Sequence, residues 1–387
     1  MKREFRYAVL GLGGIGSATL YRLARRAGNE VIGFERYELG HGRGASEDHS
    51  RIIRRSYHTP GYVRLADRAY RAWEEVERES GEWLVLRTGG LDLWPPGAAI
   101  PMEDYTRSMR TAGVTFEQLH AAEVMRRWPQ WRLHPNTRAI FQEDGGLVSA
   151  SRANSVHRDL AAGHGAVVRE RSPVTAIRDA GGELELQAGG ERFRVGTLLV
   201  AADAWTNEVL AMLDVPTLPL TLTKEQVVYL DGNAGFAPER FPVWIWMDDP
   251  SFYGVPVFGE PGPKVGQDAG GPEIPDGDSR EDEPDPAALE RVHRFAEERL
   301  PAAGPPRSIR TCTYTLTPDR DFVLDRVPGH PEVLVALGAA HGFKFAAWFG
   351  EVLAELAPGG TVPGDLSPFA LDRPLLAMAE PPRRFLI

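Results

Sequence analysis

The sequence contains a single cysteine, Cys312, among 387 residues. One thiol cannot form an intramolecular disulfide, and one sulfur atom cannot hold a metal ion alone. We therefore expect neither a disulfide framework nor a metal site. The chain also lacks any apolar run of the roughly 18 residues that a membrane-spanning helix needs. No internal repeat is present, so a solenoid or array is excluded.

An excess of positive charge is absent as well. The formal net charge is −10 at pH 7, which argues against a protein that binds nucleic acid or an anionic membrane surface. Lys2, Arg3 and Arg6 precede an apolar run, as in a signal peptide. That run is rich in glycine and leads into an amphipathic helix, which suits a folded strand and turn better. We expect a cytoplasmic protein.

The length points to more than one domain. A chain of 387 residues exceeds the roughly 250–300 residues at which single hydrophobic cores stop growing. Hydrophobic residues make up 42% and charged residues 25% of the chain, which is typical of a globular enzyme. Two domains of ordinary composition are therefore expected.

The segment "YAVLGLGGIGSATLYRLARRAGNEVIGFER" predicts one complete βαβ unit. Short apolar runs at 7–10 and 31–34 are typical of buried parallel strands. Between them, Ala18, Leu20 and Leu23 recur at helical spacing, and glycine and asparagine follow as a stop signal.

The glycine turn of this unit fits the pattern G-x-G-x-x-G. Gly11 permits a tight turn, Gly13 lets the backbone approach a pyrophosphate, and Gly16 allows close packing of helix and strand. The helix N-terminus then offers unpaired N–H groups to phosphates. Glu35 ends the second strand, where its carboxylate can accept hydrogen bonds from both ribose hydroxyls. The pattern predicts a dinucleotide site, disfavours NADP, and leaves NAD and FAD open.

Further elements follow from hydrophobic spacing. We expect helices where the period is near 3.6, including one capped by Ser149 or Ser151, and strands where apolar and polar residues alternate. An acidic, proline-rich stretch is interpreted as a surface loop rather than a partner-binding tail. The expected helices lie over 62–80, 102–130 with a break near 128–129, and 287–300, and a strand is expected at 88–95. The segment 146–170 is expected to hold a short strand, the capped helix and a strand starting at 166. The rest are a meander over 172–202, the loop 270–286, and a closing strand and helix over 332–357.

Three longer motifs resemble one protein family. They are "HGRGASEDHSRIIRRSYH", "CTYTLTPDRDF" and "LGAAHGFKF", and the string C-x-Y-T-x-T-P-D is far more specific than the glycine turn. Together they resemble the FAD-dependent amine oxidases of the monomeric sarcosine oxidase and N-methyl-L-tryptophan oxidase family, over nearly the whole chain. The resemblance implies an α/β, two-domain fold. A Rossmann-like FAD-binding domain would be built from 1–90, 145–218 and 310–387, and a mostly antiparallel substrate domain from 91–144 and 219–309.

The same resemblance gives the lone cysteine a role. In the family, FAD is tethered by a thioether between its 8-methyl carbon and a cysteine at the position of Cys312, so FAD is expected here with an 8α-S-cysteinyl link. Such chemistry needs one thiolate and no second thiol. The remaining residues expected to hold the cofactor are Gly11, Gly13, Gly14, Ile15, Gly16, Glu35, Arg36, Ser46, Arg51, Gly342 and Lys344.

Substrate-binding and catalytic residues are carried over in the same way. Arg54 and Lys344 are expected to clamp the substrate carboxylate, because a guanidinium and an ammonium suit a small amino acid. Lys264 matches the lysine that activates oxygen, where a cation stabilises the negative charge developing on O₂. The other expected residues are Tyr253 and Tyr314 in the substrate pocket, Arg51 beside the flavin, His341 over the flavin face, and Tyr253 and Asp268 among the catalytic groups.

One position departs from the family pattern. Sarcosine oxidases have Gly-Tyr-His after the lysine, whereas this chain has Gly266, Gln267 and Asp268. The carboxylate could bind a protonated amine, raise its pKa, or point away. A bulky run contributes Trp244 and Trp246, and we expect these two residues, with Phe252 and Tyr253, to line a pocket for an aromatic or ring side chain.

The expected function is FAD-dependent oxidation of a secondary N-methyl amino acid by a monomer. The C–H bond next to nitrogen is oxidised, the imine is hydrolysed to an amino acid and formaldehyde, and O₂ becomes H₂O₂. Other substrates left open are N-methyl-L-tryptophan, the cyclic imino acids pipecolate and proline, and glycated amino acids. An NAD-dependent dehydrogenase and a non-catalytic nucleotide-binding module are the alternatives from other classes.

Overall fold

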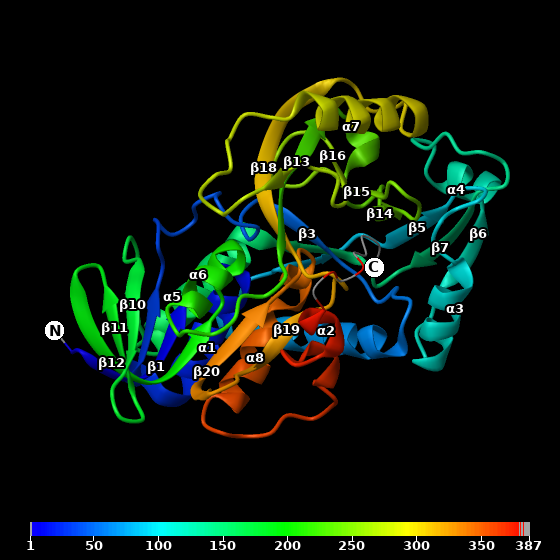
Figure 1. Cartoon of the computed structure of the whole chain (residues 1–387). Helices are drawn as coiled ribbons and strands as arrows, with labels where there is room; N and C mark the ends of the chain where they lie inside the picture. Colours follow the sequence, from blue (N-terminus) through cyan, green and yellow to red (C-terminus); the bar gives the residue numbers. More distant parts are fainter. Residues whose placement is uncertain (1, 379, 381, 383–387) are drawn as a thin grey trace.

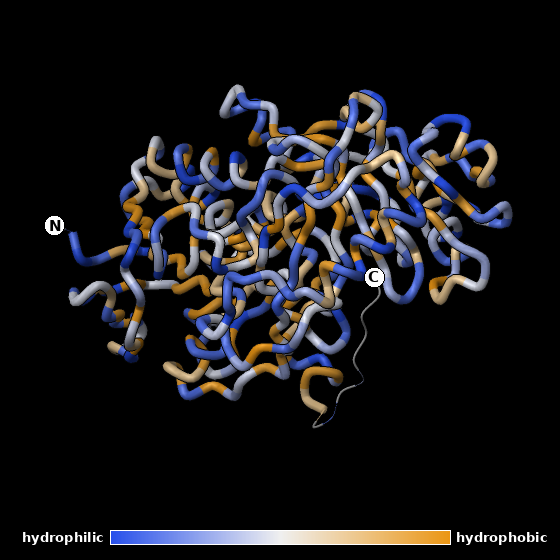
Figure 2. The backbone as a smooth tube through the Cα atoms, turned by 90° about the horizontal axis from the view of Figure 1, so that it is seen from above, coloured by the Kyte–Doolittle hydropathy of each residue, from blue (hydrophilic) through white to orange (hydrophobic). Residues whose placement is uncertain are grey.

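A computed structural model describes residues 2–378, 380 and 382. In the described chain, strands form sheets of eight, nine and three members, and helices cover their faces (Figure 1). The tube in Figure 2 shows hydrophobic segments gathered inside the molecule, whereas the outer loops are mostly hydrophilic. Among the described helices, none is both long and apolar enough to span a lipid bilayer.

The glycine turn follows strand β1 of the eight-stranded sheet. The main path of this sheet is parallel around β1, with a meander at one side, and a further strand pair joins through β12. In spatial order the strands are β10 (Val174–Asp179), β11 (Leu184–Ala188), β12 (Glu191–Val200), β1 (Glu4–Leu10), β2 (Val31–Phe34) and β9 (Val167–Arg169), with β20 (His330–Leu337) on β12 and β19 (Val323–Val327) on β20. This is the predicted Rossmann-like arrangement.

Alternation along β1 explains why both faces of this sheet are covered. Tyr7 and Val9 belong to one hydrophobic cluster, whereas Ala8 and Leu10 belong to another, as expected for successive residues of a strand. Helices α1 (Gly14–Ala27), α2 (Pro60–Ser80), α5 (Ala150–Gly163) and α8 (Ala346–Leu356) contribute to the first cluster, and the short α6 (Thr206–Ala211) contributes to the second.

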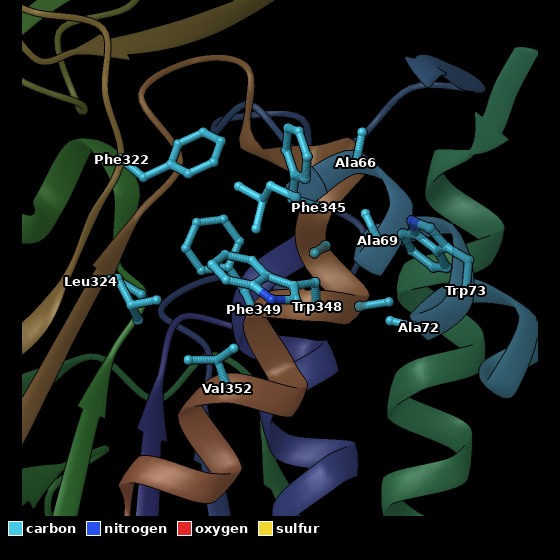
Figure 3. Packing of buried hydrophobic residues seen from close by; sticks show 14 of the residues in the cluster. Ala66, Ala69, Ala72, Trp73, Phe322, Leu324, Phe345, Trp348, Phe349 and Val352 are labelled. Atoms are coloured by element: carbon cyan, nitrogen blue, oxygen red, sulfur yellow. The ribbon is translucent and has the colours of Figure 1, made fainter. Parts of the chain in front are cut away.

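Small and large side chains interlock where α2 meets α8. Helix α2 contributes Ala66, Ala69 and Ala72 to the cluster, and α8 contributes Trp348 and Phe349 (Figure 3). Alanines let the two helices approach closely, and the aromatic rings fill the space beyond them. Deleting a fully buried aromatic side chain of this kind typically costs about 3–5 kcal/mol. The packing therefore anchors the C-terminal helix beside the glycine turn.

The nine-stranded sheet is mostly antiparallel, as expected for the substrate side. Only the pair β14–β5 is parallel. In order its strands are β17 (Glu273–Ile274), β13 (Thr221–Leu230), β16 (Lys264–Gln267), β15 (Phe252–Val255), β14 (Val243–Trp246), β5 (Gly90–Trp94), β7 (Arg138–Gln142) and β6 (Glu117–His120), with β18 (Pro306–Leu316) paired to β13. Helix α7 (Pro286–Arg299) covers one face of it, and α3 (Met102–Thr111) and α4 (Ala121–Arg127) lie near its far end (Figure 1).

The third sheet has three strands. Its strands are β3 (Ser50–Ile53), β8 (Gly146–Ser149) and β4 (Val85–Arg87). The remaining short 3₁₀ helices are Gly28–Glu30, Asp203–Trp205, Ala234–Phe236, Gly342–Phe345, Ser367–Phe369 and Pro374–Ala377.

Most expected elements are confirmed, and one prediction is wrong. The segment 102–130 is not one helix broken near Trp128, because α3 ends at Thr111 and the edge strand β6 precedes α4. Gly113, with φ +73°, follows α3 in a conformation that a continuing helix does not allow. Ser149 is the N-cap residue of α5, although its side chain makes no capping hydrogen bond.

The acidic loop after β17 is more than a solvated connection. Asp278 accepts hydrogen bonds from Arg36 at 2.9 Å and from the Trp205 indole at 3.0 Å. Arg280 donates to the Gly42 carbonyl at 2.9 Å. The loop thus begins at the nine-stranded sheet and makes hydrogen bonds with residues that follow β2 of the eight-stranded sheet.

We retain the division into an FAD-binding and a substrate-binding domain as a proposal. The boundary placed at residue 310 falls within β18, which pairs with β13 from Pro306 to Leu316. The hydrogen bonds of β18 therefore make it a strand of the nine-stranded sheet over its whole length.

Candidate active site

A cavity of about 360 Å³ is lined by residues from both large sheets. It brings together most of the residues singled out in the sequence. Those that line it are Gly11, Gly13, Gly14, Ile15, Glu35, Arg36, Ser46, Arg51, Tyr253, Lys264, Asp268, Cys312, Tyr314, His341, Gly342 and Lys344. Of the expected cofactor and carboxylate-binding residues, Gly16 and Arg54 do not line it, and both lie behind its wall as described below. The three aromatic residues Trp244, Trp246 and Phe252 do not line it either.

The glycine turn is built as its sequence pattern predicts. Gly11 has φ +83°, and a Cβ there would lie 2.4 Å from the Ala201 carbonyl oxygen. A Cβ on Gly16 would lie 1.7 Å from the Gly11 carbonyl oxygen, so this glycine serves helix packing and not the cavity. A Cβ on Gly13 would lie 2.6 Å from Ser46 Oγ, which itself accepts the Gly14 N–H at 2.9 Å. Only bare backbone therefore fits here.

Glu35 lies at the end of β2 and faces this turn. Its carboxylate accepts the Leu12 N–H at 2.9 Å and the Tyr37 N–H at 3.2 Å, and His41 Nε2 lies 3.2 Å away. Burial raises the pKa of Glu35, but the hydrogen bonds from His41, Leu12 and Tyr37 outweigh it, so the net pKa is lowered. The group is an anion at neutral pH, ready to accept from hydroxyls.

Arg36, beside Glu35, is engaged by acids. It lies 2.9 Å from Glu208 and 2.9 Å from Asp278. These bonds hold the arginine at the rim of the cavity, next to the acidic loop.

The other end of the cavity contains the lone thiol. Cys312 lies on β18, and burial raises the pKa of its thiol to about 12, against the opposing effect of the Arg51 cation. Arg51 on β3 donates to the carbonyls of Ala45 and Glu47 at 2.7 Å each and to that of Ser50 at 2.8 Å. Arg51 is thus a fixed positive charge beside the cysteine.

Lys264 is a second buried cation at this end. It is 2% exposed, and its Nζ donates to Asp48 Oδ2 at 3.0 Å and to the Ser50 carbonyl at 2.7 Å. Burial lowers the pKa of Lys264 to about 8, although Asp48 raises it in part.

Lys344 and Arg54 surround the ring of Tyr57. Lys344 Nζ lies 5.8 Å and the Arg54 guanidinium 4.7 Å from its centroid. Arg54 is held behind the wall by Asp92, whose Oδ2 lies 3.4 Å from Nη1, and by the Ser56 carbonyl. Burial, with Arg54 adding to it, lowers the pKa of Lys344 to about 7. Within the described chain, Lys344 Nζ has no hydrogen-bond partner, so its donors are free for a ligand.

Asp268, the residue that departs from the family pattern, lines the cavity and forms an ion pair. Nη2 of Arg320 donates to both of its carboxylate oxygens, at 3.2 Å each. The Arg320 carbonyl in turn accepts a hydrogen bond from His341 Nε2 at 2.7 Å. Burial lowers the pKa of His341 well below its ordinary value, and the cations Lys344 and Arg320 add to this, so the imidazole is neutral.

Tyr253 and Tyr314 line the cavity with their hydroxyls 3.3 Å apart. The prediction that Trp244, Trp246 and Phe252 line it is wrong, because all three lie on the opposite face of the sheet. They contact Phe295 of α7, with ring centroids 5.6, 5.5 and 4.3 Å away. Alternation along β14 and β15 turns Ile245 and Tyr253 toward the cavity instead.

Three residues at the site were missed from the sequence: Asp48, Asp92 and Arg320. Asp48 and Arg320 stand inside motifs already singled out, "SEDHSR" and "TPDRDF", so proximity to those motifs was an available signal. Asp92 lies in an ordinary-looking strand, and only its burial beside Arg54 marks it.

The cavity fits FAD. One end has bare glycine backbone, a helix N-terminus and an anionic Glu35, which suit a pyrophosphate and a ribose. The other end holds the cysteine and the two lysines. The adenosine part would be held by the glycine turn and Glu35, and the flavin part by residues beside Arg51, Cys312 and Gly342.

Comparisons with known proteins agree with this fit. Residues 6–356 match the family model described as FAD dependent oxidoreductase. The chain is 30% identical to monomeric sarcosine oxidase from Arthrobacter sp. over 98% of this chain and 99% of that one. It is 28% identical to N-methyl-L-tryptophan oxidase from Citrobacter koseri over 94% and 98% of the two chains. The structure of NikD, an unusual amino acid oxidase essential for nikkomycin biosynthesis, superposes with a TM-score of 0.86 at 22% identity, covering 95% of this chain and 98% of that one.

These matches confirm the fold class and decide in favour of FAD over NAD, which the glycine turn had left open. They also argue against the alternative of a non-catalytic nucleotide-binding module, because the matched proteins are enzymes. The chain therefore belongs to the FAD dependent oxidoreductase family, as a flavin oxidase that acts on CH–NH bonds and is related to monomeric sarcosine oxidase and N-methyl-L-tryptophan oxidase.

Proposed function

We propose that this enzyme oxidises secondary N-methyl amino acids of the sarcosine type. The amine, O₂ and water are converted to the demethylated amino acid, formaldehyde and H₂O₂. The observation that carries the proposal is the free ammonium of Lys344, which lines the same cavity as Cys312 and Lys264. When bound, FAD supplies the electron acceptor for the C–H bond next to nitrogen.

The substrate carboxylate is bound by Lys344, with Arg54 adding positive charge from behind the wall. An ammonium uses three N–H donors, and none of those on Lys344 is satisfied within the described chain. Arg54 is 5% exposed and compensated by Asp92, so its contribution is electrostatic and it also fixes Tyr57. Placing the carboxylate here orients the N-methyl group for reaction.

Among the described residues, the part of the wall formed by Asp268 and His341 offers no unpaired anion to the substrate amine. Asp268 is neutralised by Arg320, and His341 is a neutral imidazole. A neutral amine is the form whose adjacent C–H bond is readily oxidised, and this wall does not stabilise the protonated form. We therefore propose Asp268 as a residue that shapes the wall rather than as a general base.

The structure weakens the case for large aromatic substrates. Trp244, Trp246 and Phe252 face α7 and cannot stack on a substrate ring. The residues available at that wall are Ile245, Tyr253 and Tyr314. N-methyl-L-tryptophan, cyclic imino acids and glycated amino acids are therefore ranked below small N-methyl amino acids.

Oxygen is reduced beside Lys264 in this proposal. Its ammonium stabilises the negative charge that develops on O₂ as the first electron arrives. The cofactor is proposed to be linked to Cys312 Sγ, since this thiol lines the cavity. Because burial keeps the thiol protonated, forming the thioether would break its S–H bond and one C–H bond of the 8-methyl group. Two protons would be released, and the two electrons would be taken up by the flavin ring, which O₂ would reoxidise.

Two measurements test the proposal. Acid precipitation should leave the yellow colour in the washed pellet of the parent and release it to the supernatant in Cys312→Ser. Peroxide release should then be fastest with sarcosine or N-methylalanine among the candidate amines. Colour that washes away from the parent protein contradicts the covalent link, and much faster turnover of a bulkier amine contradicts the substrate class. A monomeric state and a cytoplasmic location stay predictions.

A further inference from the structure

We propose that Asp48 is a positioning residue for oxygen reduction, holding the Lys264 ammonium cationic and aimed into the cavity. This inference rests on the oxygen-activating role of Lys264 in the proposed function. Asp48 was not among the residues expected from the sequence, and its contacts are what single it out.

The carboxylate of Asp48 has four partners on four separate strands, two that donate hydrogen bonds to it and two that form ion pairs with it. Lys264 Nζ on β16 lies 3.0 Å from Oδ2, and the Tyr229 hydroxyl on β13 lies 2.6 Å from Oδ1. Arg51 on β3 approaches at 3.5 Å and Arg310 on β18 at 3.7 Å. An acid shared in this way fixes the position of each donor more firmly than an isolated pair does.

The backbone of Asp48 is itself held in place. Its φ is +119°, a conformation that residues with a Cβ rarely adopt. Ser151 at the start of α5 secures it, because Ser151 Oγ donates to the Asp48 carbonyl at 2.8 Å and accepts its N–H at 3.2 Å. The Ser151 N–H donates to the same carbonyl at 3.1 Å. Unusual backbone secured by several bonds is typical of functional positions.

Among the described residues, Lys264 Nζ has two hydrogen-bond acceptors, which leaves one of its N–H groups unused. Asp48 and the Ser50 carbonyl take two of its three N–H groups, and the residue lines the cavity. These two acceptors therefore fix the direction of the third N–H, although the lysine side chain itself is flexible. A 2% exposed lysine fixed in this way meets O₂ without reorganisation.

The charge balance around Lys264 makes Asp48 decisive. Burial and the Arg51 cation lower the pKa of Lys264. Asp48 raises it, Cys312 makes a smaller contribution in the same direction, and the resulting pKa is about 8. Without the Asp48 charge the lysine would lose its proton at lower pH. In the step at issue, O₂ takes two electrons from the reduced flavin and two protons to give H₂O₂, and a neutral amine cannot stabilise the charge on the first product.

The decisive experiment follows reoxidation of the holoenzyme by O₂ after chemical reduction, so it needs no amine substrate. Asp48→Asn keeps size and tolerates positive φ. We expect its reoxidation at pH 8 to be at least about tenfold slower, and its fall with rising pH to begin lower than in the parent. Anaerobic reduction by an amine should change far less. Asp48→Glu, which keeps the charge, should recover part of the rate and serves if Asp48→Asn folds poorly.

Two controls separate positioning from general damage. Glu260→Gln removes an acid that binds Arg310 and does not contact Lys264, and it should leave reoxidation unchanged. Adding Asp48→Asn to Lys264→Met should give no further loss, because the two residues act through one ammonium. Additive losses, or equal slowing of both half-reactions, would overturn the proposal.

A second readout does not depend on turnover. The chain has four lysines, Lys2, Lys224, Lys264 and Lys344, so ¹³Cε-lysine labelling gives four resolvable signals, assigned with Lys264→Met. The Lys264 titration should move to lower pH in Asp48→Asn. An unmoved midpoint contradicts the proposal. If Lys264→Met alone reoxidises at the parent rate, the oxygen role of Lys264 in the proposed function fails instead, while the titration still reports whether Asp48 controls this lysine.

Discussion

Nη2 of Arg320 lies 3.2 Å from both carboxylate oxygens of Asp268, which forms an ion pair at the position where sarcosine oxidases have a histidine. Arg320 is 2% exposed and Asp268 about one quarter exposed. The pair joins the end of β16 to the loop after β18, and through the Arg320 carbonyl it orients His341. The residue at this position is thus linked, through Arg320, to a second residue of the cavity wall.

Asp268→Asn should destabilise the protein. It leaves Arg320 as a buried cation with less compensation, and removing one partner of a buried pair costs about 3–5 kcal/mol, reduced here to about 1–3 because Asp268 is partly exposed. Thermal unfolding of the holoenzyme measures this as a lower Tm. Glu290→Gln, which removes an exposed pair with Arg294, is the control and should change Tm little. A Tm equal to that of the parent in Asp268→Asn contradicts a structural pair.

Binding of carboxylates should weaken as pH rises through about 7. The pKa of Lys344 is lowered to about 7, so its charge is present below that pH and lost above it, and His341 stays neutral throughout. Acetate has no amine to titrate, so its dissociation constant isolates the effect and should rise up to about tenfold between pH 6 and 8. Lys344→Met should flatten this profile, whereas Lys224→Met should not. A steep profile in Lys344→Met would falsify the assignment, and would point to Lys264.

Opposite faces of β14 should respond differently to mutation. Trp244→Ala opens a space against Phe295 and should cost about 3–5 kcal/mol, measured by denaturant unfolding, without changing the ranking of substrates. Ile245→Ala, next to it but facing the cavity, should instead raise peroxide release from bulkier N-methyl amines relative to sarcosine. The reverse result would place the tryptophan in the substrate pocket.

Gly13→Ala should yield enzyme with little flavin. The added Cβ would lie 2.6 Å from Ser46 Oγ, so the turn cannot keep its shape and also let a pyrophosphate approach. The absorbance ratio of flavin to protein after purification measures the loss. Ser46→Gly in the same chain should restore part of the flavin by removing the clash. Gly163→Ala, where a Cβ meets nothing within 4 Å, should retain the parent ratio.

Sequence patterns were reliable where the physics is local. The βαβ unit, the glycine turn and Glu35 follow from residues close in the chain, and strand spacing and backbone sterics dictate them. The resemblance to a family placed Cys312, Lys264 and Lys344 in one site, and the structure does bring all three to one cavity.

Side-chain direction in the second sheet could not be predicted in the same way. The run containing Trp244 and Trp246 shows which residues alternate, but it does not show which face meets α7 and which meets the cavity. A shift of one residue in register would exchange the two faces. That choice depends on packing against Phe295, which lies far along the chain.

By itself, the sequence determined a dinucleotide-binding turn, a two-domain α/β chain and, through its motifs, a flavin oxidase. Only the tertiary structure decided which acidic residues form ion pairs with the cations of the site. Asp48 meets Lys264 across 216 residues, Asp92 meets Arg54 across 38, and Asp268 meets Arg320 across 52. Such pairs form because a buried charge must find a partner, and which partner it finds depends on how strands distant in the sequence are brought side by side.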